Sequence, residues 1–270
     1  MLIKFDKMQA LGNDFVMIDV RANELCREFI PTICNRNYGI GCDTLVLYKQ
    51  QDSEIFADFF NPDGSEAEIC GNAARCIGLL MKKQNGVLQF TLRTKKKSYP
   101  IQVDKDICVN MGEPSFDPEE IGVPENVTSE FMLKKLNLPN DVYHASCISV
   151  GNPHLVLFCN NILDEGKMKS LGTRLENNSL FKNKINVSFA HVTEKGEIDL
   201  TVFERGAGLT LACGSGACAA AAVAYIDHII LSKKILVKQR GGKLFILIDD
   251  NLNISKIGPA SHVFYGWIEL

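Results

Sequence analysis

Two stretches of the chain, FFNPDGSEAEICGNAARC at residues 59–76 and VFERGAGLTLACGSGACA at residues 202–219, follow one pattern. Each begins with an apolar pair, passes through a turn and reaches a cysteine, Cys70 in the first and Cys213 in the second. A glycine follows each cysteine directly, and small residues follow the glycine. The alignment suggests that a single structural unit occurs twice.

A second match lies upstream of each stretch. LGNDFVMI at residues 11–18 falls on VGNPHLVL at residues 150–157, with a Gly-Asn pair at the same place in both. Two matches in the same order and at nearly the same spacing predict two similar halves. A solenoid would instead show shorter periods in several copies.

The local pattern around the two cysteines also repeats. A strand is expected before each, at 55–60 and at 198–203, and the second alternates cleanly between apolar and polar residues. A helix is expected after each. The first shows one apolar face and ends near Gly86, whereas the Ala-rich run 217–226 predicts a slim helix packed on all sides. The residues of the first helix's apolar face are Ala73, Cys76, Ile77, Leu80 and Met81.

The remaining pattern consists mostly of short strands separated by turns. We predict an α+β fold of two similar halves, 1–115 and 116–261, each with an antiparallel-rich mixed sheet around a central helix, and a linker at about 114–140. Further strands are expected at 2–7, 15–20, 44–48, 87–93, 101–111, 155–158, 186–192, 235–238 and 244–248, and short helices at 23–34 and 165–171.

Composition excludes several classes of function. Hydrophobic residues make up 46% and charged residues 23%, as in a soluble globular protein, and the net charge of -3 gives no electrostatic footprint for nucleic acid. The longest apolar run is too short to span a bilayer, and the charged first residues do not form a signal peptide. We therefore expect a cytoplasmic protein with no nucleic-acid or membrane partner.

The 10 cysteines are scattered along the chain. With no export signal, reduced thiols are expected rather than a disulfide framework. Neither Cys70 with Cys76 nor Cys213 with Cys218 forms the tight CxxC pair of a structural zinc site, so no metal site is predicted. Most cysteines are interpreted as small buried residues, including Cys76 and Cys218 inside the two helices.

Cys70 and Cys213 are different because each stands where a helix is expected to begin. Free backbone N–H groups and the positive end of the helix dipole lie there, and such surroundings lower the pKa of a thiol. The same N–H groups bind carboxylates. On the residues alone, Cys70 could equally be a buried small residue, and the repeat at Cys213 favours a functional pair.

Two such sites suit one reaction class. If the halves face each other, one thiolate removes a proton from a carbon atom and the opposite thiol returns a proton to the other face. The product has an inverted stereocentre. The N–H groups that hold the substrate carboxylate would stabilise the carbanion.

One stretch resembles a cofactor motif. GSGACA at residues 214–219 imitates a dinucleotide-binding loop, but the strand after its helix ends in Lys238 and Arg240 rather than in the acid that would hold a ribose. With no Walker loop and no pyridoxal lysine in view, no cofactor is predicted.

Several long motifs in order resemble the diaminopimelate epimerase family. They are MQALGNDF, FNPDGSEAEICGNAARC, VGNPH, INVSF, ERGAGLTLACGSGACA and the closing GPASHVFYGW. The resemblance implies two α/β halves with the active site in the cleft between them, and a final strand at about 262–270 that returns to the first half. It further implies cofactor-independent interconversion of LL- and meso-diaminopimelate in lysine and peptidoglycan biosynthesis, and a homodimer.

The resemblance also assigns roles to residues. Cys70 and Cys213 would be the acid–base pair, with pKa values tuned by His154 and Glu204. The amides of Gly71, Asn72, Gly214 and Ser215 would hold the carboxylate at the reacting centre. The distal end of the substrate and its flanks would contact Asn13, Asn61, Asn152, Asn186, Glu204 and Arg205.

The chain departs from the family pattern at one substrate-contacting position. GIGCDTL places Thr44 where the family usually has glutamine. A threonine is shorter, so a contact with the distal end of the substrate could be lost or be bridged by water. The two-thiol chemistry does not depend on this position.

Three alternatives remain open at this stage. A proline or hydroxyproline racemase of the same superfamily would use the same thiols, but its substrate has no distal carboxylate for Asn61, Asn186 and Arg205 to hold. Phenazine-type isomerases lack the paired cysteines. A redox-sensing protein would instead close a disulfide between Cys70 and Cys213.

Overall fold

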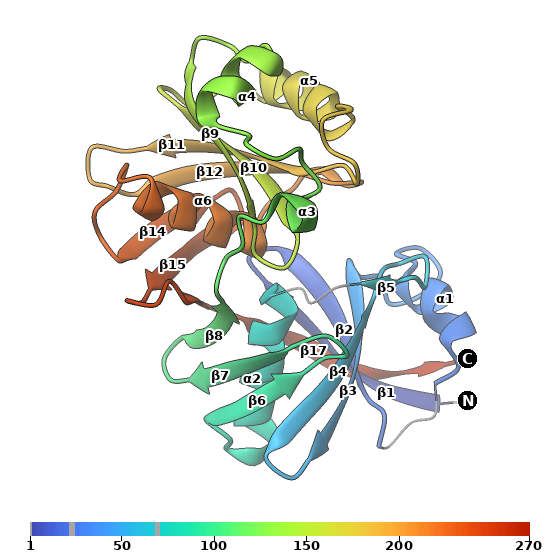
Figure 1. The fold of residues 1–270 in the computed structure, drawn as a ribbon. Helices are drawn as coiled ribbons and strands as arrows, with labels where there is room; N and C mark the ends of the chain where they lie inside the picture. The colour runs from blue at the N-terminus through green and yellow to red at the C-terminus, as the bar shows by residue number, and fades with distance from the viewer. Residues whose placement is uncertain (1, 22–24, 68–70) are drawn as a thin grey trace. The chain divides into compact units, whose positions relative to one another are not determined.

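The computed structural model describes residues 2–21, 25–67 and 71–270, and it divides them into two compact units. The first contains the described residues up to Asn110 together with Ile257–Leu270, and the second is Met111–Lys256. Figure 1 shows the elements of both units. The relation between the two units is a repeated strand order, which is described below.

The first unit is built on one mixed sheet. Its strands are β1 (Leu2–Ala10), β2 (Asn13–Asp19), β3 (Thr44–Gln51), β4 (Glu54–Phe60), β5 (Glu66–Ala67), β6 (Gln89–Arg93), β7 (Ser98–Val103), β8 (Ile107–Gly112) and β17 (Ser261–Glu269). Its helices are the 3₁₀ turn η1 (Arg27–Phe29), α1 (Ile30–Cys34) and α2 (Gly71–Asn85).

The second unit has the same organisation. Its strands are β9 (Val142–Ser149), β10 (Pro153–Cys159), β11 (Asn186–Val192), β12 (Ile198–Glu204), β13 (Gly208–Leu209), β14 (Lys234–Gln239), β15 (Gly242–Ile248) and β16 (Ile254–Gly258). Its helices are α3 (Pro118–Ile121), α4 (Ser129–Lys135), α5 (Glu165–Glu176) and α6 (Gly214–Ile226).

The pairing of strands is identical in the two units. In the first unit, the strand pairs β1–β2, β3–β4 and β6–β7 are antiparallel, and the pairs β2–β3 and β4–β6 between them are parallel. In the second, β9–β10, β10–β11, β11–β12, β12–β14 and β14–β15 follow the same sequence. The predicted α+β fold of two similar halves is confirmed. The first unit adds β17, which pairs antiparallel with β1.

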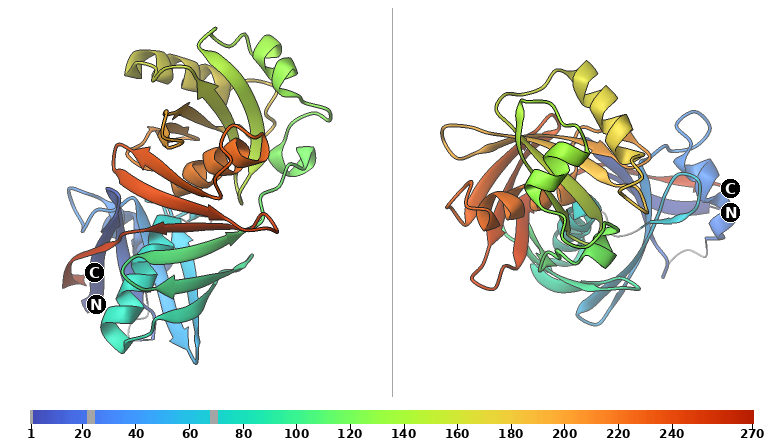
Figure 2. Two further views of the ribbon diagram at one scale, coloured as in Figure 1. Left: turned by 90° about the vertical axis from the view of Figure 1, so that its left-hand side faces the viewer. Right: turned by 45° about the horizontal axis from the view of Figure 1, so that its top comes forward.

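One helix lies at the centre of each repeat, between β5 and β6 in the first unit and between β13 and β14 in the second. In α2 the predicted apolar face is buried, with Ala73, Cys76 and Ile77 fully enclosed. In α6 every residue from Ala217 to Ala224 is 0% exposed, which confirms a helix packed on all sides. Alanine allows this because it lets strands approach the helix backbone closely. Figure 2 gives further views of α6 beside its strands.

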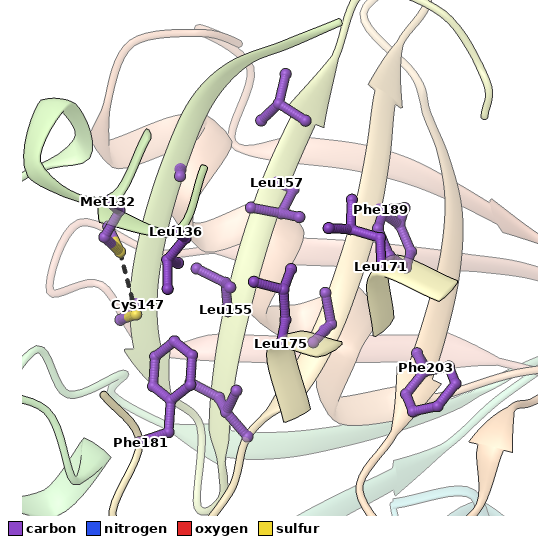
Figure 3. Close-up of a cluster of buried hydrophobic side chains, with 14 of the residues drawn as sticks. Met132, Leu136, Cys147, Leu155, Leu157, Leu171, Leu175, Phe181, Phe189 and Phe203 are labelled. Carbon is purple, nitrogen blue, oxygen red and sulfur yellow. Dashed lines mark hydrogen bonds between the residues drawn. The ribbon is translucent and has the colours of Figure 1, made fainter. Parts of the chain in front are cut away.

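The second unit has an additional layer on the other face of its sheet. Figure 1 shows α4 and α5 on one side of β9–β12 and α6 on the other. Figure 3 shows side chains that fill this layer, where Leu171 and Leu175 of α5 lie among Leu155, Leu157 and Phe189 of the sheet. A sheet buried on both faces explains the apolar run at 155–159 of β10.

The structure corrects two predictions about strands and linkers. The expected strand 101–111 is the hairpin β7–β8, because Asp104-Lys105-Asp106 interrupts the alternation and turns the chain. The expected linker 114–140 is instead a folded part of the second unit, which contains α3 and α4.

The linker prediction is wrong because polar residues of this segment cap two short helices and do not form an open loop. Asp117 accepts a hydrogen bond from the Glu119 amide and begins α3, and Thr128 does the same for Phe131 in α4. Apolar residues between the polar ones then reach the core. The buried members of this segment are Ile121, Val123, Met132 and Leu136.

The remaining helix predictions differ from the structure in extent. The expected helix 23–34 partly falls on residues outside those described, and its described part is η1 followed by α1. Helix α5 continues to Glu176, beyond the expected end at 171. Strand β9 was not predicted.

Candidate active site

Cys213 is the N-cap residue of α6. Its φ and ψ are -116° and 112°, and its Sγ accepts a hydrogen bond from the Gly216 amide at 3.4 Å. The predicted position at a helix start is therefore confirmed for this cysteine. Cys70, its expected partner, lies outside the described residues.

Gly216 is required beside the thiol for steric reasons. A Cβ atom there would lie 2.7 Å from Cγ2 of Val202 and 3.4 Å from Sγ of Cys213. The first distance is well inside van der Waals contact. The small residues after Cys213 thus let the helix begin directly against β12.

The environment of Cys213 contradicts the expected lowering of its pKa. Burial raises the pKa of the Cys213 thiol well above its ordinary value, and the negative charge of Glu204 raises it further. The Ser215 hydroxyl and the Gly216 N–H lower the pKa by less. Cys213 is therefore held as a protonated thiol at neutral pH.

A buried hydrogen-bonded chain connects this thiol to β10. Ser215 Oγ lies 3.4 Å from Cys213 Sγ and 3.0 Å from His154 Nε2. The other ring nitrogen of His154 lies 3.3 Å from Ser188 Oγ. Burial and, to a smaller extent, the charge of Arg205 lower the pKa of His154 to about 3. His154 is thus a neutral imidazole linked through Ser215 to the thiol.

The depressed pKa of His154 predicts an acid-sensitive fold. The folded-state value of about 3 lies below the ordinary value of 6.5, so the contribution of His154 is complete above pH 6.5 and is lost as pH falls toward 3. Between pH 6 and pH 4 the free energy of unfolding of the unaltered protein should fall more steeply than that of His154→Gln, by about 1.4 kcal/mol per pH unit. Urea titrations measure both slopes, which should coincide between pH 7 and pH 8. Parallel slopes at low pH would show that His154 is not buried neutral.

Asn186 and Arg205 are joined across two neighbouring strands. The Asn186 side chain donates to the Pro153 carbonyl at 2.8 Å and accepts from the Arg205 amide at 3.0 Å. The Arg205 guanidinium donates to the Asn183 carbonyl at 3.0 Å. Asn186 is buried, so its amide fixes the start of β11 relative to the end of β12.

Glu204, the last residue of β12, accepts a hydrogen bond from the Thr210 hydroxyl. Asn152 lies in the turn before β10, where its carbonyl accepts from the Val150 amide at 3.3 Å. The second unit therefore gathers His154, Asn186, Glu204, Arg205, Cys213, Gly214 and Ser215 at one end of β10–β12 and the start of α6.

Sequence reasoning missed Gln239 at the end of β14. Its Oε1 accepts the backbone N–H of Cys213 at 2.7 Å. Its Nε2 is buried and has no hydrogen-bond partner among the described residues. Gln239 thus fixes the backbone on the N-terminal side of the thiol. No local motif marks it, because the contact joins positions far apart in the sequence.

In the first unit, Asn13 and Asn72 form part of a polar chain. The Asn13 amide donates to Asp43 at 2.8 Å, and the Asn72 amide donates to Asn13 at 3.5 Å. Arg75 in turn donates to Asn72 at 2.9 Å and to the Pro259 carbonyl at 3.1 Å. Asp43 and Arg75 were not predicted, although a charged residue on the buried helix face was a visible signal.

The other predicted residues of this unit lie separately. Gly71 begins α2, and Thr44 begins β3 with 8% exposure. Asn61 follows β4 in a turn, where its side chain donates to Ser65 Oγ at 3.0 Å. Among the predicted residues of this unit that the structure describes, a side-chain hydrogen bond joins Asn13 to Asn72.

The family of the chain follows from a match over most of its length. The profile of the diaminopimelate epimerase family matches residues 5–116 and 146–263. The chain belongs to this family. It is therefore an isomerase of the epimerase type.

Individual diaminopimelate epimerases are similar over the full chain. The one from Gluconobacter oxydans is 39% identical over 98% of this chain and 99% of its own, and the one from Pelagibacter ubique is 36% identical over 97% of each. A third, from Thioalkalivibrio sulfidiphilus, is 34% identical over 100% of both chains.

Solved structures of other proteins have a similar fold, and at their low sequence identity the similarity concerns the fold alone. A phenazine biosynthesis protein of the PhzF family from Bacillus anthracis has a TM-score of 0.73 at 17% identity and covers 100% of both chains. A hydroxyproline epimerase from Agrobacterium vitis has a TM-score of 0.70 at 8% identity, over 99% of this chain and 92% of its own.

In residues 2–21, 25–67 and 71–270, no group of three or more His, Cys, Asp or Glu is placed to hold a metal ion. No helix in this part of the epimerase is long and apolar enough to cross a membrane.

Proposed function

We propose that the protein interconverts LL- and meso-2,6-diaminopimelate by moving protons between thiols, without a metal or pyridoxal phosphate. The observation that carries the proposal is the position of the Cys213 thiol at the start of α6, where Ser215 connects it to the buried side chain of His154. The relatives named diaminopimelate epimerase support the choice of substrate.

In the proposed reaction the two cysteines have opposite protonation states. Cys70, as thiolate, removes the proton from the α-carbon of the substrate, and Cys213, as thiol, delivers its proton to the opposite face. One proton leaves carbon and one arrives, so Cys70 ends as thiol and Cys213 as thiolate. The raised pKa of Cys213 supports its role as the initial acid. The reverse reaction exchanges the roles.

The backbone at the starts of α2 and α6 supplies the proposed anion site. N–H groups in the first turn of a helix have no intrahelical acceptor, and they stabilise a carboxylate whose charge rises as the carbanion forms. Gly71, Asn72, Gly214 and Ser215 provide them in the proposal. The Gly216 N–H is already engaged by Cys213 Sγ.

The second amino-acid end of the substrate is assigned to the polar residues of the two units. Arg205 offers a planar fork for a carboxylate, and asparagine offers both a donor and an acceptor for a zwitterion. We assign this end to Asn61, Asn152, Asn186, Glu204 and Arg205, with Asn13 and Thr44 beside it. We assign to His154 and Glu204 the tuning of the pKa values of the two cysteine thiols.

Proton NMR in D₂O tests the proposal directly. Reduced protein with LL-diaminopimelate should remove the α-proton signal and produce the meso isomer. If no exchange occurs while the thiols titrate as free, the proposed function fails. Proline and hydroxyproline are the second substrates to test, because the hydroxyproline epimerase shares the fold.

Gln239 provides a prediction specific to this chain. Gln239→Leu removes the acceptor of the Cys213 N–H and leaves that buried donor unpaired, which costs about 1–3 kcal/mol. Misplacement of the thiol should lower kcat about tenfold, while KM stays within about twofold because the substrate contacts remain. Lys238→Ala, the neighbouring residue paired with Glu197, is the control and should retain full kcat. Equal losses in both variants would contradict a positioning role.

The proposed enzyme acts in lysine and peptidoglycan-precursor synthesis in the cytoplasm, as a homodimer. Exposed apolar side chains on β17 support the dimer, since contiguous exposed apolar residues mark interaction surfaces. Val263, Phe264, Tyr265 and Trp267 are 55%, 47%, 62% and 57% exposed.

Light scattering tests the dimer. The unaltered protein should have twice the 29.9 kDa chain mass, and Trp267→Glu should shift it toward the monomer because a charge in an apolar interface is costly. Tyr38→Glu, at an aromatic residue that is 86% exposed elsewhere in the first unit, should leave the mass unchanged. A monomeric mass for the unaltered protein would refute this assembly.

A further inference from the structure

A second pair of thiols lies within the first unit, separate from the two thiols assigned to catalysis. Cys34 ends α1 and Cys42 follows the next turn, and their Sγ atoms are 3.4 Å apart. Both residues are buried, with 3% and 2% exposure. No sequence motif marks this contact, because Cys34 and Cys42 are separated by a turn and do not form a CxxC pair.

The backbone already holds the two cysteines as direct neighbours. The Cys42 amide donates to the Cys34 carbonyl at 3.2 Å, and the Gly41 amide donates to the Ile33 carbonyl at 3.0 Å. A disulfide has an S–S length of about 2.05 Å. Closing the remaining gap therefore requires a small movement of two side chains rather than a rearrangement of the chain.

The charges around the pair distinguish the two sulfurs. The S–H of Cys42 is directed at Cys34 and lowers the pKa of the Cys34 thiol. The positive charge of Lys7 also lowers this pKa, whereas burial and the negative charge of Asp14 raise it, and the net effect is a lowered pKa. The Lys7 ammonium is fixed nearby by the Gly41 carbonyl and, at 2.5 Å, by Asp14. The pKa of Cys42 is raised, first by its hydrogen bond to Cys34 and then by burial.

We propose that Cys34 and Cys42 are a dithiol that a small hydroperoxide oxidises reversibly to a disulfide. The Cys34 thiolate attacks one oxygen of hydrogen peroxide, the O–O bond breaks, and water leaves after protonation. Cys42 then loses its proton and attacks the resulting sulfenic acid, which forms the S–S bond and releases a second water. Both sulfurs are oxidised, and one peroxide is reduced to two waters.

The pair lies next to residues that organise the first unit. Asp43 directly follows Cys42, and its carboxylate accepts from the Asn13 side chain at 2.8 Å and from Arg36 at 2.9 Å. Strand β3 begins one residue later. The disulfide would thus form at the base of the turn that carries Asp43, independently of the thiols assigned to catalysis.

Peptide mapping of the folded, full-length protein tests the proposal. Trypsin separates the two cysteines into peptides 28–36 and 37–49, each with a single cysteine. After treatment with hydrogen peroxide and alkylation of free thiols, these peptides should appear cross-linked with the loss of two hydrogens. Dithiothreitol should separate them. The readout does not involve turnover, so it fails or succeeds separately from the proposed epimerase activity.

The controls exclude non-specific oxidation. Cys147 is also buried, but its Sγ faces the Met132 sulfur at 3.4 Å and burial raises its pKa to about 12, so it should stay reduced under the same treatment. In Cys42→Ala the cross-link must disappear and Cys34 should be trapped as sulfenic acid by dimedone. In the unaltered protein, cross-linking should be at least about tenfold faster when folded than in guanidinium, because folding raises the effective concentration of one thiol at the other.

Three results would overturn the proposal. The first is alkylation of both cysteines under conditions that oxidise other thiols of the protein. The second is a cross-link that forms equally fast in guanidinium. The third is conversion of Cys34 to sulfinic or sulfonic acid without any cross-linked peptide, which would show that Cys42 does not resolve it.

Discussion

Replacement of Cys213 by alanine is expected to lower the rate of diaminopimelate epimerisation by about a thousandfold. The proposed mechanism gives this thiol the proton that completes the inversion, and a positioned acid or base contributes about 10²–10⁴ in rate. Alanine has no proton to give. Since the backbone bonds of Cys213 to Gln239 and Ala217 do not involve the side chain, the start of α6 should remain in place.

Two measurements distinguish this loss from unfolding. Circular dichroism should show an unchanged secondary structure, and KM should change little because the proposed carboxylate contacts come from backbone N–H groups. Cys213→Ser should be nearly as inactive as alanine, because a hydroxyl is a far weaker acid and base than a thiol.

Cys218→Ala provides the matched control in the same helix. Cys218 is 0% exposed and is flanked by alanines, so the exchange removes one buried sulfur without touching the proposed site. Its turnover should stay within about threefold of the unaltered protein. If the Cys213→Ala variant retained more than a tenth of the activity, Cys213 would not be the group that transfers the proton.

The repeated fold could be predicted because each half carries its own local signals. The alternation of apolar and polar residues at 198–203 predicts the strand β12, and the apolar residues at helical spacing after Cys70 predict the helix α2. A single match could have been an accident of composition. Two matches in order required the same elements twice, and the structure has the same strand pairing twice.

The errors arose where local polarity was taken as evidence of an open chain. The residue types of the 114–140 segment occur both in linkers and in short capped helices. Only the packing of this segment against β9 and β10 shows that it forms helices. Asp117 and Thr128 are examples, since both are cap residues and both are common in loops. Tertiary contacts decide whether such a segment is an open linker or a pair of helices.

The site shows a further limit of sequence reasoning. A helix start favours a thiolate, but the burial of Cys213 and the charge of Glu204 outweigh that effect and favour the thiol. Burial depends on the whole unit and is not visible in a motif. For the same reason, the contacts of Gln239 with Cys213 and of Cys34 with Cys42 could not be predicted from their local sequence.

The second large effect is expected at Gly172, in the middle of α5. A Cβ atom there would lie 2.4 Å from Cγ of Phe203 and 2.6 Å from its Cδ2. Figure 3 shows Phe203 at one side of the core cluster that also contains Leu171 and Leu175 of α5. Gly172→Ala must therefore push the helix away from the sheet or displace the ring.

Gly172→Ala should lower the free energy of unfolding by about 2 kcal/mol. Overpacking of a dense core costs about 1–3 kcal/mol and occasionally more, and the contact with a rigid ring places this site at the upper end. The better helix propensity of alanine returns at most about 1 kcal/mol. Because Phe203 directly precedes Glu204 and Arg205, the shift should also lower epimerase turnover.

Gly166→Ala, in the first turn of the same helix, provides the control. Gly166 is exposed, and a Cβ there would meet only Oδ1 of Asp164, at 3.3 Å, a much looser contact than the one at Gly172. The free energy of unfolding should change by less than about 1 kcal/mol. Urea titration of both variants measures the difference. Equal stabilities would mean that α5 adjusts without loss, and that the close contact between Gly172 and Phe203 does not hold the helix on the sheet.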